Sequence, residues 1–179
     1  RGDDLIFPAS PNLVVINDLV DLSVNSITIR DNYVISGFPL EITGDILMVS
    51  LQDVTASLTL DVALRKVPIR VGTEDGTLIL SGVVTAQSLQ KAGLGTLVLT
   101  NANNIDAVAG VPNCGVIRAT HAEALGAGTS RAAGQIQLSE GCTLRLEAMT
   151  TLEKPISLNG NGALGNTGVL VIAAGVTLN

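Results

Sequence analysis

The sequence predicts an all-β fold in which short parallel strands stack into a coil, and three observations predict it. Short alternating or apolar runs, punctuated by Gly, Asn and Asp, fill the chain, whereas amphipathic stretches of helix length are missing. Pairs of aliphatic residues recur at nearly constant steps. Aromatic residues make up only 2% of the chain while apolar residues make up 46%, so the core must be almost wholly aliphatic, as a narrow coil interior requires.

The strands are expected wherever an apolar run lies between turn residues. A helix over residues 85–91 is possible by propensity, but Gly93 and Gly95 would end it too soon. The capping-box spacing of residues 120–123, followed by Gly126, predicts one helical turn at most. The clearest strand candidates are Ser26–Ile29, residues 33–36, Leu40–Ile42, residues 57–60 and residues 76–80.

The repeat is the most informative feature. Five aliphatic pairs recur at nearly even intervals, with a longer interval before the last, and each pair brackets one residue of the opposite strand face. A step of about 20 residues between equivalent strands is typical of a coil in which each turn lies on the one before. The pairs are Leu58/Leu60, Leu78/Leu80, Leu97/Leu99, Ile117/Ala119 and Leu144/Leu146.

The composition changes near residue 75. Residues 1–75 contain eleven of the sixteen acids, five of the ten bases and only four of the nineteen glycines. The net charge of −6 therefore belongs to this acidic N-terminal β region, which we expect to form the first coils, a cap or a small β-sandwich. Residues 76–179 form a Gly-rich repeat region. No linker separates the two, so we expect regions of one structure.

Composition also weakens several functional classes. A negative net charge and three aromatic residues argue against nucleic-acid binding, and no apolar run approaches the length of a membrane-spanning segment. The absence of Trp is unusual for a sugar-cleaving enzyme. The chain opens at Arg1 without Met, so we expect a piece of a longer protein.

Two motifs that resemble binding sites have simpler explanations. Residues 160–165 match GxGxxG, but a strand-like run follows in place of a helix, and no acid comes later, so we expect a turn and no cofactor. His121 is the only histidine and has no cluster of Cys, His or carboxylates around it. We therefore expect neither a metal site nor a hydrolase site there.

Paired carboxylates are the serious enzymatic alternative. Asp3-Asp4 and Glu74-Asp75 each stand beside Gly in turn-like sequence, and neighbours on a strand point to opposite faces. Neither pair converges alone, and only a partner from another coil could complete an acid–base site. The alternative function is a carbohydrate-active enzyme, a lyase or glycosidase, on a parallel β-helix.

Residues 82–179 resemble the autotransporter passenger-associated β-strand repeat. The resemblance is carried by residues 88–103 (SLQKAGLGTLVLTNAN), with Gly115–Ala119, residues 124–128, residues 141–146 and residues 158–162 continuing the pattern. The residues after Asn104 depart from the pattern of the family, and the two cysteines are not required by it.

The resemblance implies a right-handed parallel β-helix, here of roughly eight coils, from a large exported bacterial surface protein. The function expected is a non-enzymatic extracellular structural or adhesive module, without catalytic residues. Its expected partners are neighbouring coils or further copies of the chain stacked end to end into fibres, because solenoid ends expose unpaired strands.

The two cysteines are predicted to be bonded. Aligning Ile117 with Leu144 puts Cys114 over Gly141, one residue from the position above Cys142. A coil spacing of about 4.8 Å and one residue of stagger give a Cα separation of about 5.8 Å, inside the disulfide range. The alternative is a pair of buried free thiols, but export favours the bond.

Overall fold

The fold is a parallel β-solenoid of about seven turns, seen here in a computed structural model. The structure describes residues 2–49, 53–65, 68–126, 134–148, 151–152, 154–163, 169–173 and 177–178, and within them it contains strands and turns but no helix. The number of turns is slightly below the expected eight, because two turns take up more of the chain than the others. One turn separates Gly110 from its register partner Leu138, and another separates Leu144 from Leu170.

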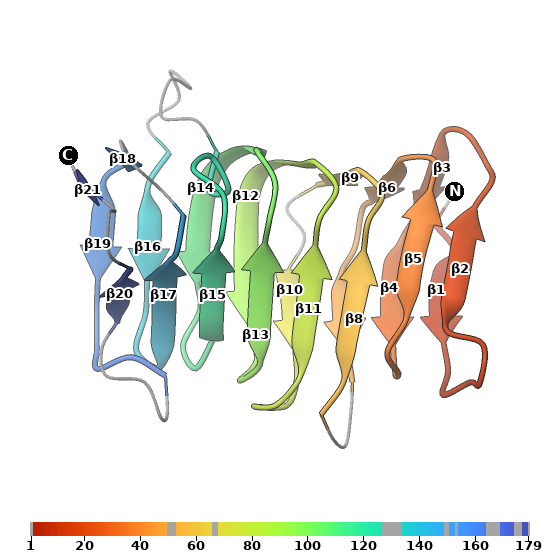
Figure 1. Ribbon diagram of the computed structural model, residues 1–179, viewed down its shortest axis with the longest axis horizontal. Coiled ribbons are helices and arrows are strands. Elements are labelled where there is room, and N and C mark those ends of the chain that lie inside the picture. Colours follow the sequence, from red (N-terminus) through yellow and green to blue (C-terminus); the bar gives the residue numbers. More distant parts are fainter. Residues whose placement is uncertain are drawn as a thin grey trace.

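One side of the solenoid is an eight-stranded parallel sheet with one strand from each successive turn. Figure 1 shows these strands side by side along the long axis of the molecule, all pointing the same way. The strands are, in spatial order, β2 (Val14–Asn17), β5 (Val34–Gly37), β8 (Thr55–Leu58), β11 (Thr77–Leu80), β13 (Thr96–Leu99), β15 (Gly115–Ala119), β17 (Cys142–Leu146) and β20 (Leu170–Ile172).

The remaining sides belong to an eleven-stranded parallel sheet. Its main path is β1 (Asp4–Phe7), β4 (Ser26–Ile29), β7 (Ile46–Met48), β10 (Pro68–Val71), β12 (Val84–Ala92), β14 (Asn104–Gly110), β16 (Ile136–Leu138) and β19 (Ile156–Leu158). Its branch is β3 (Leu22–Val24), β6 (Leu40–Ile42) and β9 (Val62–Leu64). At the C-terminal end, β18 (Thr151–Leu152) pairs with β21 (Thr177–Leu178).

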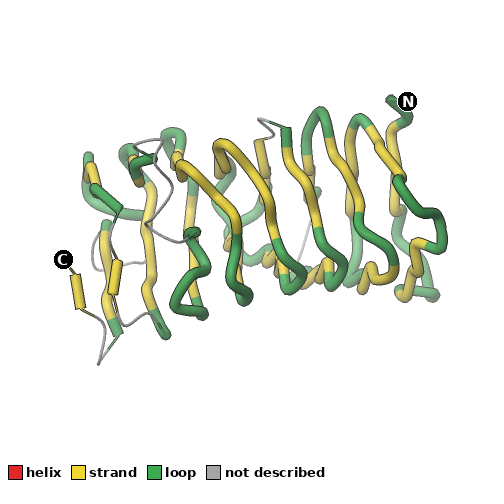
Figure 2. The backbone as a smooth tube through the Cα atoms, turned by 90° about the horizontal axis from the view of Figure 1, so that it is seen from above, coloured by secondary structure: helices red, strands yellow, loops and turns green. Residues whose placement is uncertain are grey.

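The cross-section has three sides because β12 runs around a corner. Its first residues pair with β9 and its last residues pair with β10, so the short strands β3, β6 and β9 form a side of their own. Viewed from above, the backbone winds as one continuous coil from the N-terminal to the C-terminal end (Figure 2). The short side, called the branch face below, lies along the upper edge in Figure 1.

The interior is built from columns of aliphatic side chains, one residue per turn. Leu78, Leu97, Ile117 and Leu144 are in register and fully buried, which confirms the alignment of four of the five pairs. The first pair is displaced: Leu58 lies beside Leu80, and Ala56 takes the place beside Leu78. Because Ala56 is small, the more conspicuous Leu58 was matched to the wrong column position.

The acidic and Gly-rich regions share the same sheets. Strands β1 to β10, all before residue 75, continue directly into β11 and β12. The first region is therefore a set of coils and not a sandwich. The turn at residues 121–126 is closed by hydrogen bonds from Ala124 N to His121 O and from Gly126 N to Glu123 O, with Gly126 at a φ of +85°.

Candidate functional site

The carboxylate pairs singled out in the sequence lie in different coils and do not meet. Asp4 Oδ1 accepts hydrogen bonds from Ser26 Oγ at 2.7 Å and from Asn25 Nδ2 at 2.8 Å, and the Ser26 bond lowers the pKa of this carboxyl. Glu74 instead lines a small cavity of about 250 Å³ that also includes Arg145. Asp4 links the first two coils, which is a structural role.

His121 and the glycine run also have local roles. His121 Nδ1 accepts a hydrogen bond from the Glu123 backbone N–H at 3.1 Å, inside its own turn. Gly160 and Gly162 have φ values of +101° and +90°, and Ala163 N donates to Thr143 Oγ1 at 2.9 Å. Residues 164 and 165 of the motif lie outside the described residues. The described part of the run, up to residue 163, is irregular backbone that follows β19.

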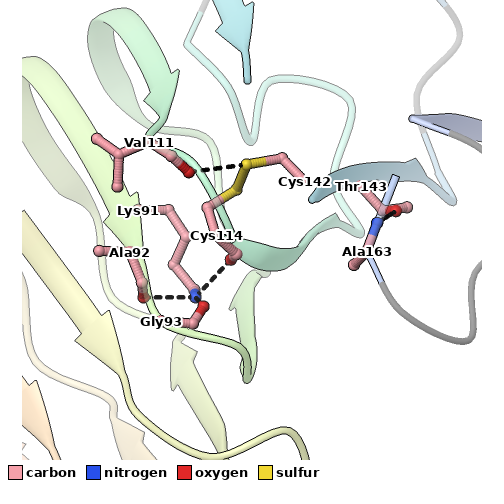
Figure 3. The surroundings of a disulfide bond; sticks show 8 residues. All are labelled: Lys91, Ala92, Gly93, Val111, Cys114, Cys142, Thr143 and Ala163. Carbon is pink, nitrogen blue, oxygen red and sulfur yellow. Dashed lines mark hydrogen bonds between the residues drawn. A yellow bond between two sulfur atoms is a disulfide. The ribbon is translucent and has the colours of Figure 1, made fainter. Parts of the chain in front are cut away.

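Cys114 and Cys142 are joined by a disulfide between adjacent turns, with Cα atoms 4.8 Å apart (Figure 3). Gly115 pairs with Cys142 in the β15–β17 register, so Cys114 stands one residue out of line with its partner. The bond occupies space left by Gly110. A Cβ atom at this glycine would lie 2.6 Å from Cys114 Sγ and 2.8 Å from Cys142 Sγ, so no larger residue fits.

Lys91 is a fully buried lysine beside the disulfide. It occupies an inward position in the column formed by Ile27, Ile46, Ile69, Lys91 and Gly110. Its ammonium group donates three hydrogen bonds of 2.8 Å, to the carbonyl oxygens of Ala92, Gly93 and Cys114 (Figure 3). Burial away from water lowers the pKa of Lys91 to about 7.

A second lysine repeats this arrangement. Lys154 is buried, and its Nζ donates to the carbonyl oxygens of Ile105, of Asp106 at 3.0 Å and of Leu125 at 2.7 Å. Burial lowers the pKa of Lys154, and the Asp106 charge opposes this shift. Lys154 thus ties β14 to the turn that precedes residue 127. Each lysine donates to three carbonyl groups, which is the ordinary condition for burying a polar group.

An open groove of about 820 Å³ crosses the branch face. Its floor includes Ser23, Glu41, Ala63 and Thr85, which are adjacent in register on four neighbouring strands. Its walls are corner residues. The whole lining is Leu19, Val20, Asp21, Leu22, Ser23, Phe38, Pro39, Leu40, Glu41, Asp61, Val62, Ala63, Val83 and Thr85.

Three carboxylates from three successive coils line this groove, at Asp21, Glu41 and Asp61. Asp61 Oδ1 accepts the Val83 backbone N–H at 2.7 Å, and Glu41 forms an ion pair with Arg65. Both carboxylates accept hydrogen bonds from the fold, whereas a general acid must carry a proton and direct it at the substrate. The groove therefore combines carboxylates held by the fold with exposed apolar side chains.

These residues were not among those predicted from the sequence. Asp21, Glu41 and Asp61 recur at even intervals that match the spacing of the aliphatic pairs, and this period is the signal that could have identified them. Lys91 is the register partner of Ile69 and lies two residues after Leu89, so it points to the same face of the strand as Leu89. Its inward position could therefore also have been predicted from the repeat.

Among the described residues, no three His, Cys, Asp or Glu side chains are grouped so as to hold a metal ion. The described part of the chain also lacks any helix that is long and apolar enough to cross a membrane. Comparisons of the chain with protein-family models, with curated proteins and with solved structures found no match.

Proposed function

We propose that this chain is a non-enzymatic structural and adhesive β-helix module of a large exported bacterial surface protein. The observation that carries the proposal is the disulfide inside a continuous solenoid, because structural disulfides persist in oxidising compartments and are rare in the cytosol. The resemblance of residues 82–179 to the autotransporter passenger-associated repeat supports the same role.

The uninterrupted sheets support a structural role. One strand from each turn extends the eight-stranded sheet, and the strand pairs run in register from β2 to β20. Such an array transmits load through backbone hydrogen bonds and packed columns and needs no moving part.

Export is tested on the cells that make the protein. Antibodies against the chain should label intact cells, and external protease should remove that signal while sparing a cytosolic marker. Alkylation before reduction should leave Cys114 and Cys142 unlabelled. Detection only after lysis, with both thiols alkylated in the native protein, would contradict the proposal.

End-to-end contact between solenoids belongs to the same proposal. Strands β1 and β2 are the edge strands of the two sheets at the N-terminal end, and they carry exposed Ile6, Val14 and Ile16, of which Val14 is 70% exposed. Apolar side chains exposed at this density favour contact with another surface. Light scattering of the isolated chain should show association that Val14→Thr with Ile16→Thr weakens. A monodisperse monomer at high concentration would contradict stacking.

A carbohydrate-active enzyme is the second candidate, and the three carboxylates of the groove are the observation that favours it. A panel of polysaccharides, assayed for new reducing ends, separates the two functions. The structural proposal expects no turnover. Cleavage that Glu41→Gln or Asp61→Asn abolishes would replace it with the enzyme.

A further inference from the structure

We propose that the groove on the branch face binds an extended peptide segment in which Lys or Arg side chains lie next to aliphatic ones. This binding site goes beyond the structural role proposed above and does not depend on export. Three properties of the groove carry the inference: its dimensions, its exposed apolar wall and the sign of its charge.

The dimensions suit an extended chain. The floor column of Ser23, Glu41, Ala63 and Thr85 crosses four neighbouring strands. Three strand spacings of about 4.8 Å make about 14 Å, which is the length of about four residues of extended peptide. Ala63 has only a methyl group in the middle of this floor, which leaves room for a ligand side chain to enter.

The wall presents apolar side chains that nothing in the described structure covers. Leu19, Val20 and Phe38 line the groove and are 58%, 67% and 48% exposed. A ligand with aliphatic side chains would remove this surface from water, which favours binding. Phe38 is the only aromatic ring in the lining, so the groove offers a sugar one stacking surface at most.

The charge selects a cation. Asp21, Glu41 and Asp61 line the groove, and the lining itself has no basic residue, although Arg65 pairs with Glu41 from outside the lining. Residues 1–75 contain eleven acids and five bases, so the surrounding coils share the whole net charge of −6. A basic peptide is attracted to this surface, and an acidic one is repelled from it. Asp61 keeps its bond to Val83 N, and its carboxylate charge still attracts a cation in the groove.

The test is a fluorescence-anisotropy titration of the purified chain with a labelled hexapeptide that alternates Lys and Leu. A matched hexapeptide that alternates Glu and Leu is the first control. The Lys peptide should bind and the Glu peptide should not. Raising NaCl from 50 to 300 mM should weaken binding several-fold, because exposed charges are screened.

Variants locate the binding. Asp21→Asn and Glu41→Gln should each weaken binding of the Lys peptide about three-fold, as exposed charge pairs do. Asn tolerates the left-handed backbone of Asp21, whose φ is +55°, so this variant should fold. Val20→Thr, which removes apolar contact at nearly constant shape, should also weaken binding. Asp75→Asn and Val34→Thr change exposed residues outside the groove and should leave binding unchanged.

Four results would overturn the proposal. The Glu peptide could bind as tightly as the Lys peptide. Asp75→Asn could weaken binding as much as Asp21→Asn, which would show attraction to net charge alone. Glu41→Gln could abolish binding of a neutral oligosaccharide while the Lys peptide does not bind. Val20→Thr could reduce self-association of the chain without any effect on peptide binding, which would assign the groove to a second copy.

Discussion

The two halves of the solenoid differ in the kinds of residue that fill their interior. In the coils up to β11, the buried residues of the described structure are apolar, and the hydroxyl of buried Tyr33 donates to Pro8 O at 2.6 Å. The buried polar or charged residues of the described structure all follow β11, and so does the disulfide. These residues are Lys91, Asn103, Thr143 and Lys154.

The length of chain per turn also differs between the two halves. Ile27, Ile46, Ile69 and Lys91 succeed one another in register at similar intervals, whereas a much longer stretch of chain separates Gly110 from Leu138. Buried backbone carbonyls need a hydrogen-bond donor, and in the second half buried side chains supply it. Asn103, for example, accepts from Val84 N and donates to Ala124 O, both at 2.8 Å. The first half is thus held by stacking, and the second half by stacking together with specific cross-links.

The largest effect is expected from the aliphatic half. Ile46→Ala opens a cavity between Ile27 and Ile69 and should lower the free energy of unfolding by about 2–5 kcal/mol. Chemical denaturation followed by circular dichroism measures it, with Ile46→Val as the control at about 0.5–1.5 kcal/mol. A cost below about 1 kcal/mol for the alanine variant would break the claim that stacking holds these coils.

Removal of the disulfide tests the other half. Cys114→Ala with Cys142→Ala should cost about 2–4 kcal/mol. Faster hydrogen exchange should be confined to β15, β17 and their neighbours, with β4 to β8 unchanged. Mass spectrometry of the air-exposed native protein should find neither thiol free. Labelling of both cysteines, or exchange that rises equally in both halves, would contradict the comparison.

Lys91 should make the free energy of unfolding depend on pH. Its folded pKa of about 7 is below its ordinary value of 10.5, so above pH 7 the folded chain releases a proton that the unfolded chain keeps. Stability therefore rises with pH between 7 and about 10, by at most about 1.4 kcal/mol per pH unit, and this gain is absent below pH 7.

Lys91→Met measures this contribution. The stability of the variant should not rise between pH 7 and pH 10. Relative to the natural chain, the variant should therefore be more destabilised at pH 9 than at pH 6. Chemical denaturation at both pH values makes the comparison, with Arg70→Met as an exposed control. An equal cost at both pH values would show that Lys91 keeps its proton in the folded state.

The smallest effect is expected on the outer surface. Arg118 holds Glu147 through two hydrogen bonds of 3.1 and 2.8 Å, but both side chains are partly exposed. Glu147→Gln should cost less than about 1 kcal/mol. The Arg118 bond lowers the pKa of Glu147, so its contribution is present above the ordinary carboxyl pKa and is lost as the pH falls through the folded value. A cost as large as that of removing the disulfide would place surface pairs among the main supports of this half.

The periodic part of the fold could be predicted because the same local pattern, a turn followed by an alternating strand, recurs along the sequence. Leu97, Ile117 and Leu144 each follow a turn that contains Gly and alternate with outward residues, so spacing and parity suffice to align them. The same alignment put Cys114 over Gly141. Spacing alone aligns Leu58 with Leu78, whereas the structure pairs Leu78 with Ala56, which is too small to stand out in the sequence.

The candidate site was harder to predict because none of its residues stands out in the sequence when taken alone. Lys91 stands in a Gln-Lys-Ala-Gly segment that looks exposed, and only carbonyls such as those of Gly93 and Cys114 make its burial tolerable. Asp21 and Asp61 lie at corners of separate coils and become neighbours of one groove only when the coils stack. Residues from different coils meet only if the strands pair in the right register. The spacing of residues in the sequence determines that register only approximately.

The longest turn shows that the length of the solenoid depends on the number of its turns. Gly110 and Leu138 are far apart in sequence, yet they face each other across a single strand spacing. Each turn therefore advances the axis by about 4.8 Å, as much as about three residues of α-helix, whatever its own length. Residues added within a turn leave the length of the rod unchanged, and only a whole additional coil lengthens it. About seven turns make a rod of about 34 Å, whose length is counted in coils and not in residues.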